Sequence, residues 1–281
     1  MDPNKPTYES IIAVDSIPPL PATAATLLRM AADPDVEIED LAMVIERDPA
    51  LTARLIGIAN SAFYAPRIPV VTVKDAIIRV LGLNLVRNMA FGMAMAGGFS
   101  TAACQRFDLT VYWLMALGTA DMASGLARAS TSEDVPDPDA VYLAGLMHNV
   151  GELLLAYLWP DRLNQALTCI ETQPDVSLID AQREVIGVDQ WTAGALLARH
   201  WQLPQVVIDG IDSLGATAEA PGSPELGLIL RTARRWVGGV VAGRPDTLRV
   251  DGVDEAYCEY RSSAFISRYD ALKALAHSMG G

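Results

Sequence analysis

The chain is poor in the two residue types that build most transition-metal and redox sites, since its 281 residues include three histidines and three cysteines. Cys104, Cys169 and Cys258 are far apart, so they form neither a disulfide framework nor a paired-cysteine metal motif. We predict three buried, unreactive thiols. No glycine-rich phosphate loop and no nucleophilic serine elbow occurs in the sequence. The sequence therefore contains no motif that indicates acyl transfer or nucleotide binding.

Positive charge is also scarce. The 21 Lys and Arg residues stand against 34 Asp and Glu residues, which gives a formal net charge of −13. A chain this acidic repels a phosphate backbone unless its basic side chains gather in one patch. The basic cluster Arg231, Arg234 and Arg235 has helical spacing, and we interpret it as a solvated face. We therefore predict no nucleic-acid partner.

Long hydrophobic runs are missing as well. Apolar stretches such as residues 89–99 are short and contain glycine, so we expect none of them to span a bilayer. Residues 1–10 are polar and carry no signal-segment pattern. The sequence predicts a cytoplasmic protein with no membrane partner.

What the chain does contain is alanine, leucine and frequent helix-start signals. Asp48, followed by proline, is a typical N-cap residue. Thr72 begins a capping-box pattern and Gly82 ends the helix that it opens. We expect Asn84 to cap the next helix, over residues 85–96. With no convincing period-two strand pattern, these signals predict an all-α fold of about a dozen helices.

Three segments are rich in small, polar or helix-breaking residues: 129–139, 215–224 and 243–252. None is long enough to act as a disordered tether. We predict that they are surface loops of one compact body.

Residues 139–159 form an apolar helix candidate that carries the doublet His148-Asn149. An aspartate at position 149 would place imidazole and carboxylate side by side, as in a divalent-metal site. Asparagine keeps the shape of the carboxylate but loses the charge that holds a hard metal ion. The doublet therefore indicates a metal-hydrolase architecture with a ligand missing.

Residues 17–92 contain motifs whose order and spacing resemble those of the HDOD family, the HD-related output domains of bacterial signalling proteins. These motifs are Leu20-Pro21, IERDPAL at 45–51, ANSAFY at 59–64 and AIIRVLGLNLVRN at 76–88. Further along, AGLMHNVGELLL at 144–155 resembles the degenerate HD-motif helix of the family. The run GVDQWTAGALLARHWQLP at 187–204 resembles the helix that follows it.

The resemblance implies a regulatory HDOD-type bundle related to the HD phosphohydrolase fold. It predicts a lead-in over 1–16 and an HDOD domain over 17–215. Within that domain we expect an N-terminal helical part at 17–105 and an HD-like part at 106–215. The C-terminal helices, 216–281, are expected to pack on the same body.

The resemblance also indicates where metal ligands would stand. Apart from His148, these positions carry residues that bind hard divalent ions poorly: Met115, Asn149, Gln190, Leu214-Gly215 and Arg234. We therefore predict no catalytic, cofactor-binding or metal-binding residue, no cofactor, and a vestigial pocket formed by Met115, His148, Asn149 and Gln190. His148 itself is predicted to be buried and hydrogen-bonded, His200 to lie at a helix end, and His277 to be uninformative near the terminus.

Two features could contribute to a partner surface. Phe63 and Tyr64 follow a helix end, where they either plug the fold or face a partner protein. Methionines at 89, 93 and 95 fit a helical core better than an interface. Residues 39–60 superficially resemble a helix-turn-helix, but the second helix offers too few polar side chains to read bases, so we interpret it as core packing.

Together these observations predict a non-enzymatic signalling domain that acts through contacts with a partner protein. Two alternatives stay open. One is a sensor that holds a small molecule or cyclic dinucleotide in the vestigial pocket. The other is a divergent metal-dependent phosphohydrolase.

Overall fold

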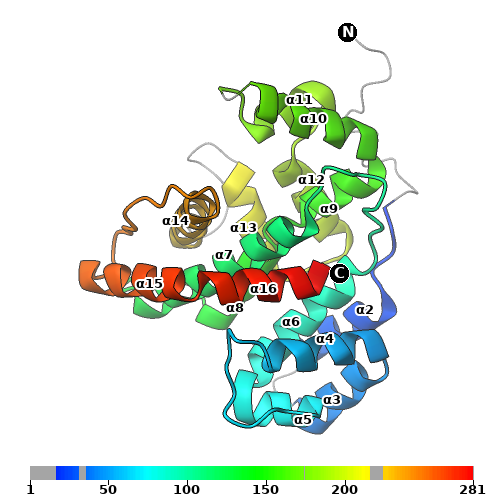
Figure 1. Cartoon of the computed structure of the whole chain (residues 1–281), viewed down its shortest axis with the longest axis vertical. Helices are drawn as coiled ribbons and strands as arrows, with labels where there is room; N and C mark the ends of the chain where they lie inside the picture. The colour runs from blue at the N-terminus through cyan, green and yellow to red at the C-terminus, as the bar shows by residue number, and fades with distance from the viewer. Residues whose placement is uncertain (1–16, 32–35, 174, 216–223, 281) are drawn as a thin grey trace.

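The computed structural model describes residues 17–31, 36–173, 175–215 and 224–280, and every regular element in these ranges is a helix (Figure 1). This confirms the predicted all-α class. The predicted lead-in, 1–16, lies outside the described residues. The helices are α2 (Ala22–Ala31), α3 (Ile38–Glu46), α4 (Pro49–Ala59), α5 (Val73–Ala76), the π-helical η1 (Ile77–Leu81), α6 (Leu83–Ala96), α7 (Leu109–Ala129), α8 (Pro138–Met147), α9 (Val150–Leu158), α10 (Pro160–Thr172), α11 (Leu178–Val185), α12 (Gln190–His200), α13 (Gln205–Gly215), α14 (Pro224–Val241), α15 (Glu255–Ser267) and α16 (Tyr269–Gly280).

Side-chain caps begin several helices where the sequence predicts them. At the start of α4, the Asp48 carboxylate accepts hydrogen bonds from the backbone N–H groups of Ala50 and Leu51. At the start of α5, Thr72 accepts one from the N–H of Asp75. These bonds satisfy donors that a helix leaves free in its first turn.

The expected cap at Asn84 is wrong. Helix α6 begins at Leu83, directly after Gly82, and no side chain caps it. Asn84 lies in the first turn, and its Nδ2 donates to Asp139 Oδ2 on α8 at 2.6 Å. The Asn84 side chain therefore bonds to Asp139, which is distant in sequence, instead of capping the backbone of its own helix.

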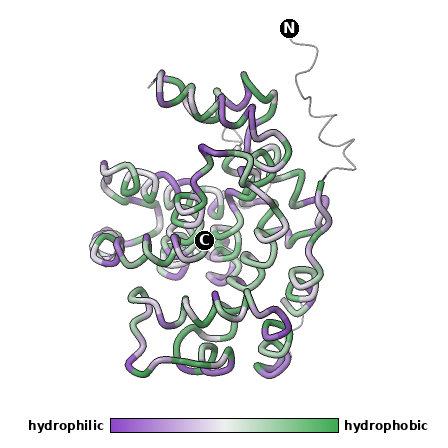
Figure 2. Tube along the Cα trace, turned by 45° about the vertical axis from the view of Figure 1, so that its right-hand side comes forward, coloured by the Kyte–Doolittle hydropathy of each residue, from purple (hydrophilic) through white to green (hydrophobic). Residues whose placement is uncertain are grey.

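Helix α7 lies at the centre of the molecule. It packs against α8, α14 and α16, and its Tyr112 and Trp113 side chains are almost wholly buried. Figure 1 shows α2 to α6 at one end of the molecule and α10 and α11 at the other. Hydrophobic segments concentrate where the central helices meet, as the colouring of Figure 2 shows. The methionines at 89, 93 and 95 are part of this core, as expected.

Helices α9 and α12 touch through their backbones. A Cβ atom at Gly151 would overlap the carbonyl oxygen of Gln190 and lie 2.6 Å from the amide nitrogen of Gly194. Only glycine allows this approach at position 151. The contact brings the segment containing His148 against the start of α12.

The helix expected over residues 139–159 is two helices. Helix α8 ends at Met147 and α9 begins at Val150. Asn149 has φ −102° and ψ 14°, away from regular helix geometry. The expectation that no apolar segment is long enough to cross a bilayer is also wrong. By length and composition alone, the segment Pro138–Leu158, which contains α8 and α9, is long and apolar enough to do so. However, 78% of its most apolar window is buried inside the fold, where packing explains its composition.

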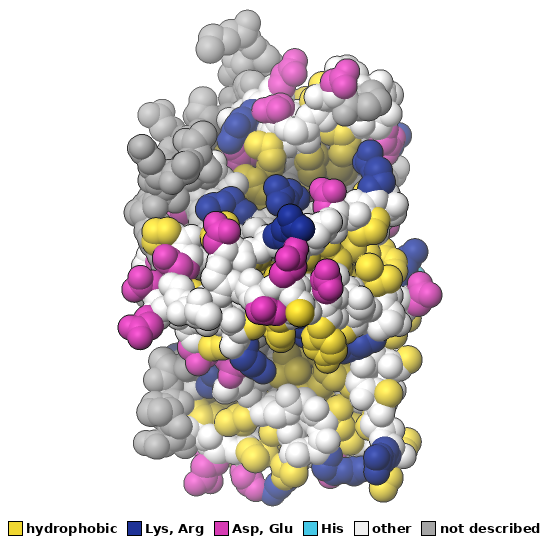
Figure 3. All heavy atoms as spheres, turned by 90° about the vertical axis from the view of Figure 1, so that its left-hand side faces the viewer, with side chains coloured by type: hydrophobic (Ala, Val, Ile, Leu, Met, Phe, Trp, Pro, Cys, Tyr) yellow, Lys and Arg dark blue, Asp and Glu magenta, His cyan; other side chains and the backbone are white. Residues whose placement is uncertain are grey.

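Acidic and basic side chains are mixed on the face that carries α14 and α15. Figure 3 shows Lys and Arg beside Asp and Glu across this face, with hydrophobic patches between them. The view contains no continuous basic band of the kind that follows a phosphate backbone.

Candidate functional site

His148 lies at the break between α8 and α9. Its side chain is 1% exposed, and its Nδ1 lies 2.7 Å from the carbonyl oxygen of Gly145. A carbonyl only accepts, so Nδ1 carries the proton in this bond. Burial, together with the nearby charge of Arg234, lowers the pKa of His148 to about 3, against the opposing effect of the Gly145 bond. The imidazole is therefore neutral at physiological pH, as part of the folded core.

Asn149 ties the break to the central helix. Its Nδ2 donates to the carbonyl oxygen of Tyr112 on α7 at 3.0 Å. An ionised aspartate has no hydrogen to donate and would face that carbonyl with a second acceptor. The NH2 group of Asn149, which an aspartate ligand would lack, therefore makes this contact with α7. The other atom of the amide, Oδ1, is buried without a hydrogen-bond partner among the described residues.

Gln190 begins α12 and joins it to α11. The Gln182 side chain accepts a hydrogen bond from the Gln190 backbone N–H at 2.9 Å and donates one to Gln190 Oε1 at 3.1 Å. Both glutamines are fully buried. Gln190 also lies near Glu152, and this contact opposes the rise that burial causes in the pKa of Glu152. That contact is looser than a regular hydrogen bond, since Gln190 Nε2 has no partner of normal geometry in the described structure.

Met115 is the fourth residue of the predicted vestigial pocket, and the structure turns it toward α14. Its Cε lies 3.8 Å from where a Cβ on Gly238 would stand. The structure thus gathers His148, Asn149 and Gln190 around the α9–α12 contact. It packs Met115 against a different neighbour.

Three further residues complete this site: Glu152 and Trp191, which the sequence did not place here, and Arg234, which the family resemblance placed at a metal-ligand position. The Trp191 ring stacks on His148 with centroids 6.2 Å apart, and the guanidinium carbon of Arg234 lies 4.6 Å from the same ring's centroid. Burial raises the pKa of Glu152, and the charge of Arg234 partly opposes this rise. Burial likewise lowers the pKa of Arg234, and Glu152 opposes that change.

The prediction of a solvated face formed by Arg231, Arg234 and Arg235 is wrong for Arg234. Arg231 and Arg235 are exposed, whereas the Nε of Arg234 is buried. The sequence held a signal for this difference. Arg234 follows the buried Leu230 by four residues and precedes the buried Val237 by three, so helical periodicity places it on the apolar face.

The site does not fit a divalent metal. Described residues contain no group of three or more His, Cys, Asp or Glu side chains placed to hold an ion. His148 is the one imidazole present, and the charge of Glu152 is offset by that of Arg234. A buried guanidinium beside this pair opposes a second cation. The opposite charges of Arg234 and Glu152 partly offset each other at this site.

The remaining candidate residues lie elsewhere. Phe63 and Tyr64 are half-buried, in an edge-to-face contact at 5.1 Å, and Arg268 covers the Phe63 ring at 3.8 Å. This is the plug arrangement; their role toward a partner stays a prediction. His200 is the exposed last residue of α12. His277 is exposed on α16, with Nδ1 3.3 Å from Thr110 Oγ1.

The expectation of three buried thiols is wrong for one cysteine. Cys104 and Cys258 are buried, but Cys169 is partly exposed. Cys169 lies on the outlying helix α10, away from the central core (Figure 1). Burial raises the thiol pKa of the two buried cysteines, which keeps them protonated.

Most of the chain matches the model of a known protein family. The family model of the HDOD domain covers residues 17–214 of the chain. The chain belongs to the HDOD family. An uncharacterized protein of Treponema pallidum (strain Nichols) is 30% identical over 198 residues, which is 70% of this chain and 37% of the relative. The chain therefore spans little more than a third of that protein.

Solved structures share the HDOD fold. A protein assigned to signal transduction from Marinobacter aquaeolei VT8 has a TM-score of 0.79 and 27% identity, over 97% of this chain and 61% of its own. An HDOD protein of unknown function from Geobacter sulfurreducens has a TM-score of 0.73 and 23% identity, over 96% of each chain. A protein assigned as a phosphohydrolase from Shewanella amazonensis SB2B has a TM-score of 0.75 and 22% identity, over 97% of this chain and 99% of its own. The predicted relation to the HD phosphohydrolase fold is confirmed.

Proposed function

We propose that this HDOD domain is a non-catalytic signalling module that acts by binding a partner protein. The family and the likeness to a signal-transduction protein support the signalling role. The observation that carries the non-catalytic part is the half-buried Arg234, whose Nε is enclosed and whose charge acts on both His148 and Glu152. A phosphohydrolase of this architecture needs a metal to polarise the phosphoryl oxygen and activate water. Here the positive charge of Arg234, beside Glu152, opposes the binding of a metal cation.

Metal analysis and hydrolysis assays test the non-catalytic part. We expect purified protein to retain no stoichiometric divalent metal and to show no metal-dependent turnover of cyclic or linear phosphodiesters. A matched variant, Arg234→Asp, replaces the internal cation with a carboxylate, and we expect it to bind divalent metal more tightly than the wild type. Stoichiometric metal with metal-dependent turnover in the wild type would overturn the proposal in favour of the phosphohydrolase alternative.

The N-terminal helices offer a surface for a partner. Large hydrophobic side chains are unusually exposed there: Met43 at 53%, Ile68 at 65%, Val71 at 76% and Ile78 at 59%. Contiguous exposed apolar patches mark interaction sites, whereas single exposed apolar side chains are common, so the proposal requires these four residues to act together. The sequence did not single them out, because each lies inside a pattern that also fits core packing.

Affinity capture from the native host tests the partner-binding part. We expect reproducible capture of one partner by the wild type and its loss in a Val71→Asp/Ile78→Asp variant. A matched control, Tyr260→Asp/Ile266→Asp, removes exposed hydrophobic residues from α15 instead and should leave capture intact. Capture of no reproducible partner, or equal loss in both variants, would count against the proposal.

A second candidate function is a small-molecule sensor at the vestigial site. It is favoured by three buried polar atoms there that lack partners among the described residues: Asn149 Oδ1, Gln190 Nε2 and Arg234 Nε. Buried polar atoms are ordinarily satisfied by protein, water or ligand. Native mass spectrometry distinguishes these cases, since a retained small molecule that is lost in Gln190→Leu would support the sensor.

A further inference from the structure

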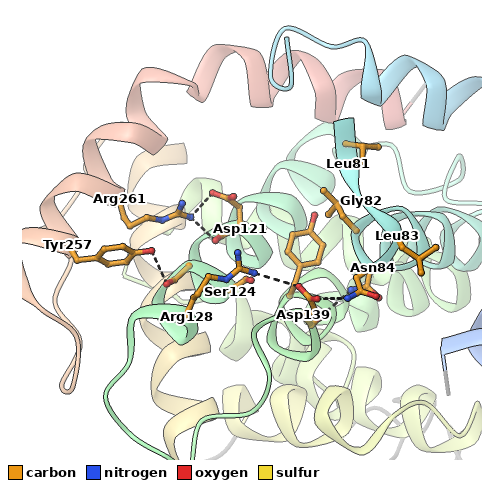
Figure 4. A pocket seen from close by; sticks show the side chains of 14 residues that line it. Leu81, Gly82, Leu83, Asn84, Asp121, Ser124, Arg128, Asp139, Tyr257 and Arg261 are labelled. Carbon is orange, nitrogen blue, oxygen red and sulfur yellow. Dashed lines mark hydrogen bonds and ion pairs between the residues drawn. The ribbon is translucent and has the colours of Figure 1, made fainter. Parts of the chain in front are cut away.

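A cavity of about 560 Å³ opens between the start of α6, the C-terminal half of α7, the start of α8 and α15 (Figure 4). Small-molecule sites commonly have volumes of roughly 300–1,000 Å³. None of the lining residues belongs to the vestigial site around His148. The cavity is therefore a separate candidate binding site.

Charged groups of both signs face this cavity. Arg261 pairs with Asp121 at 2.9 Å, and Arg128 lies 3.6 Å from Asp139. Figure 4 shows the first pair at one end of the cavity and the Asp139–Asn84 contact at the other, with Arg128 reaching toward Asp139. The enclosure thus offers both carboxylate acceptors and guanidinium donors to one ligand.

Arg261 is held in place by the backbone of α7. Its Nη2 donates to the carbonyl oxygen of Asp121 at 2.7 Å and to the carboxylate of the same residue. A Cβ at Gly125 would lie 2.6 Å from Arg261 Nε, so glycine makes room for the guanidinium to rest on the helix. The Arg261 side chain is only 17% exposed. The pair forms one wall of the cavity, with the Asp121 carboxylate as its acceptor.

Arg128, in contrast, is free to exchange partners. Its side chain is 66% exposed, and its ion pair with Asp139 is long and exposed to solvent. The start of α6 lines the cavity nearby, through Gly82, Leu83 and Asn84. No side chain caps this helix, so its first-turn N–H groups and the positive end of its dipole favour an anion.

Apolar groups complete the lining. Leu81, Leu85 and Tyr142 border the cavity beside the charged residues. Tyr257 is fixed by a hydrogen bond from its hydroxyl to the carbonyl oxygen of Gly125 at 3.1 Å. Such surfaces suit the faces of a flat ring, whose edge can then reach the carboxylates.

We propose that this cavity binds a nucleoside monophosphate, or a metabolite with the same combination of one phosphate and a flat heterocycle bearing N–H donors. Arg128 leaves Asp139 and, with the first-turn amides of α6, binds the phosphate. Asp121 and the released Asp139 accept hydrogen bonds from the N–H edge of the ring. This site goes beyond the proposed partner-binding function and does not depend on it.

Isothermal titration calorimetry of the full chain tests the proposal, with the common nucleoside 5′-monophosphates, the matched nucleosides and inorganic phosphate as probes. We expect at least one monophosphate to bind with one-to-one stoichiometry. Its nucleoside and inorganic phosphate should each bind about tenfold more weakly or worse, because each lacks half of the contacts. No binding by any monophosphate at millimolar concentration overturns the proposal, and so does phosphate binding as tightly as the nucleotide.

A matched pair of arginine variants locates the site. Arg128→Gln should weaken nucleotide binding by about tenfold. Arg249→Gln removes an arginine whose side chain is 72% exposed and paired with Glu255 outside the cavity, and it should leave affinity unchanged. In the wild type, nucleotide should slow hydrogen exchange at the amides of Leu83 and Asn84. Equal losses in both variants, or slowed exchange confined to other helices, would contradict this location.

Discussion

Two arginine–carboxylate regions of this HDOD domain differ mainly in their access to water. In the interior, Arg234 offsets Glu152 beside the stacked rings of His148 and Trp191. At the cavity, Arg128 and Asp139 meet at the surface with side chains 66% and 40% exposed. A charge taken out of water depends on its partner, whereas an exposed pair contributes little to folding. The interior pair therefore belongs to the fold, and the cavity pair is available for a ligand.

The same contrast applies to glycines. At the interior site, a side chain at Gly151 would collide with backbone atoms of Gln190 and Gly194, which cannot move aside. At the cavity, a side chain at Gly125 would meet the end of Arg261, which can. Backbone neighbours therefore require glycine at position 151 for the fold. The side chain facing position 125 can move, so a substitution there affects the cavity more than the fold.

The largest effect is expected from Gly151→Ala. We expect it to lower the free energy of unfolding by more than about 3 kcal/mol, because α9 and α12 must separate. Gly125→Ala is the matched change at the cavity and should cost about 1 kcal/mol or less, while weakening nucleotide binding by displacing Arg261. Urea denaturation measures both, and equal losses would remove the distinction between the two regions.

Arg234→Met should have the next largest effect. We expect a loss of about 3 kcal/mol in the free energy of unfolding, because Glu152 would remain buried without its counter-charge. Adding Glu152→Gln should restore most of this loss, since the double variant leaves no charge behind. A double variant as unstable as the single one would mean that packing of Arg234, and not its charge, stabilises the site.

His148 should make stability depend on pH. Its pKa is about 3 in the folded protein, below the ordinary value of 6.5, so the unfolded chain binds the proton more readily. The contribution of His148 to the free energy of unfolding is fully present above about pH 6.5, and it is lost as the pH falls toward the pKa of His148 in the folded protein. Between pH 7 and pH 5 the expected loss is about 2 kcal/mol. The variant His148→Gln should lack this component, which denaturation at the two pH values measures.

Glu152 titrates with the opposite sign. Its raised pKa gives a contribution that is present below its ordinary pKa of 4.5 and lost as the pH rises through the folded value. Because Glu152 is present in both proteins, subtracting the His148→Gln curve from the wild-type curve isolates the histidine. Parallel curves would show that His148 is not held neutral by burial.

The smallest effect is expected from Arg128→Gln. We expect a change of less than about 0.5 kcal/mol in the free energy of unfolding, because the pair with Asp139 is exposed. The measurement is the same urea titration that is applied to Arg234→Met. A loss comparable to that variant would make Arg128 structural and unsuited to exchange partners with a ligand.

The sequence predicted where the site lies better than it predicted which charged residues the site contains. His148, Asn149 and Gln190 were singled out, and the structure gathers all three. The predictions of a cap at Asn84 and of a solvated face that includes Arg234 were wrong, since each was judged from immediate neighbours in the sequence. Asn84 bonds to Asp139 and Arg234 lies against Trp191, and neither partner is close in the chain. Glu152 was missed because a single acidic residue in an apolar helix resembles an ordinary surface position.

The sequence alone determined the helical class, the family and most helix starts, because caps and apolar spacing act between residues three or four positions apart. Tertiary structure decided which charges are buried and where a cavity opens. At the break between α8 and α9, Asn149 bonds to a carbonyl group of α7, and the cavity is assembled from four separate segments of the chain. Such contacts join residues far apart in sequence, so no local pattern encodes their energies.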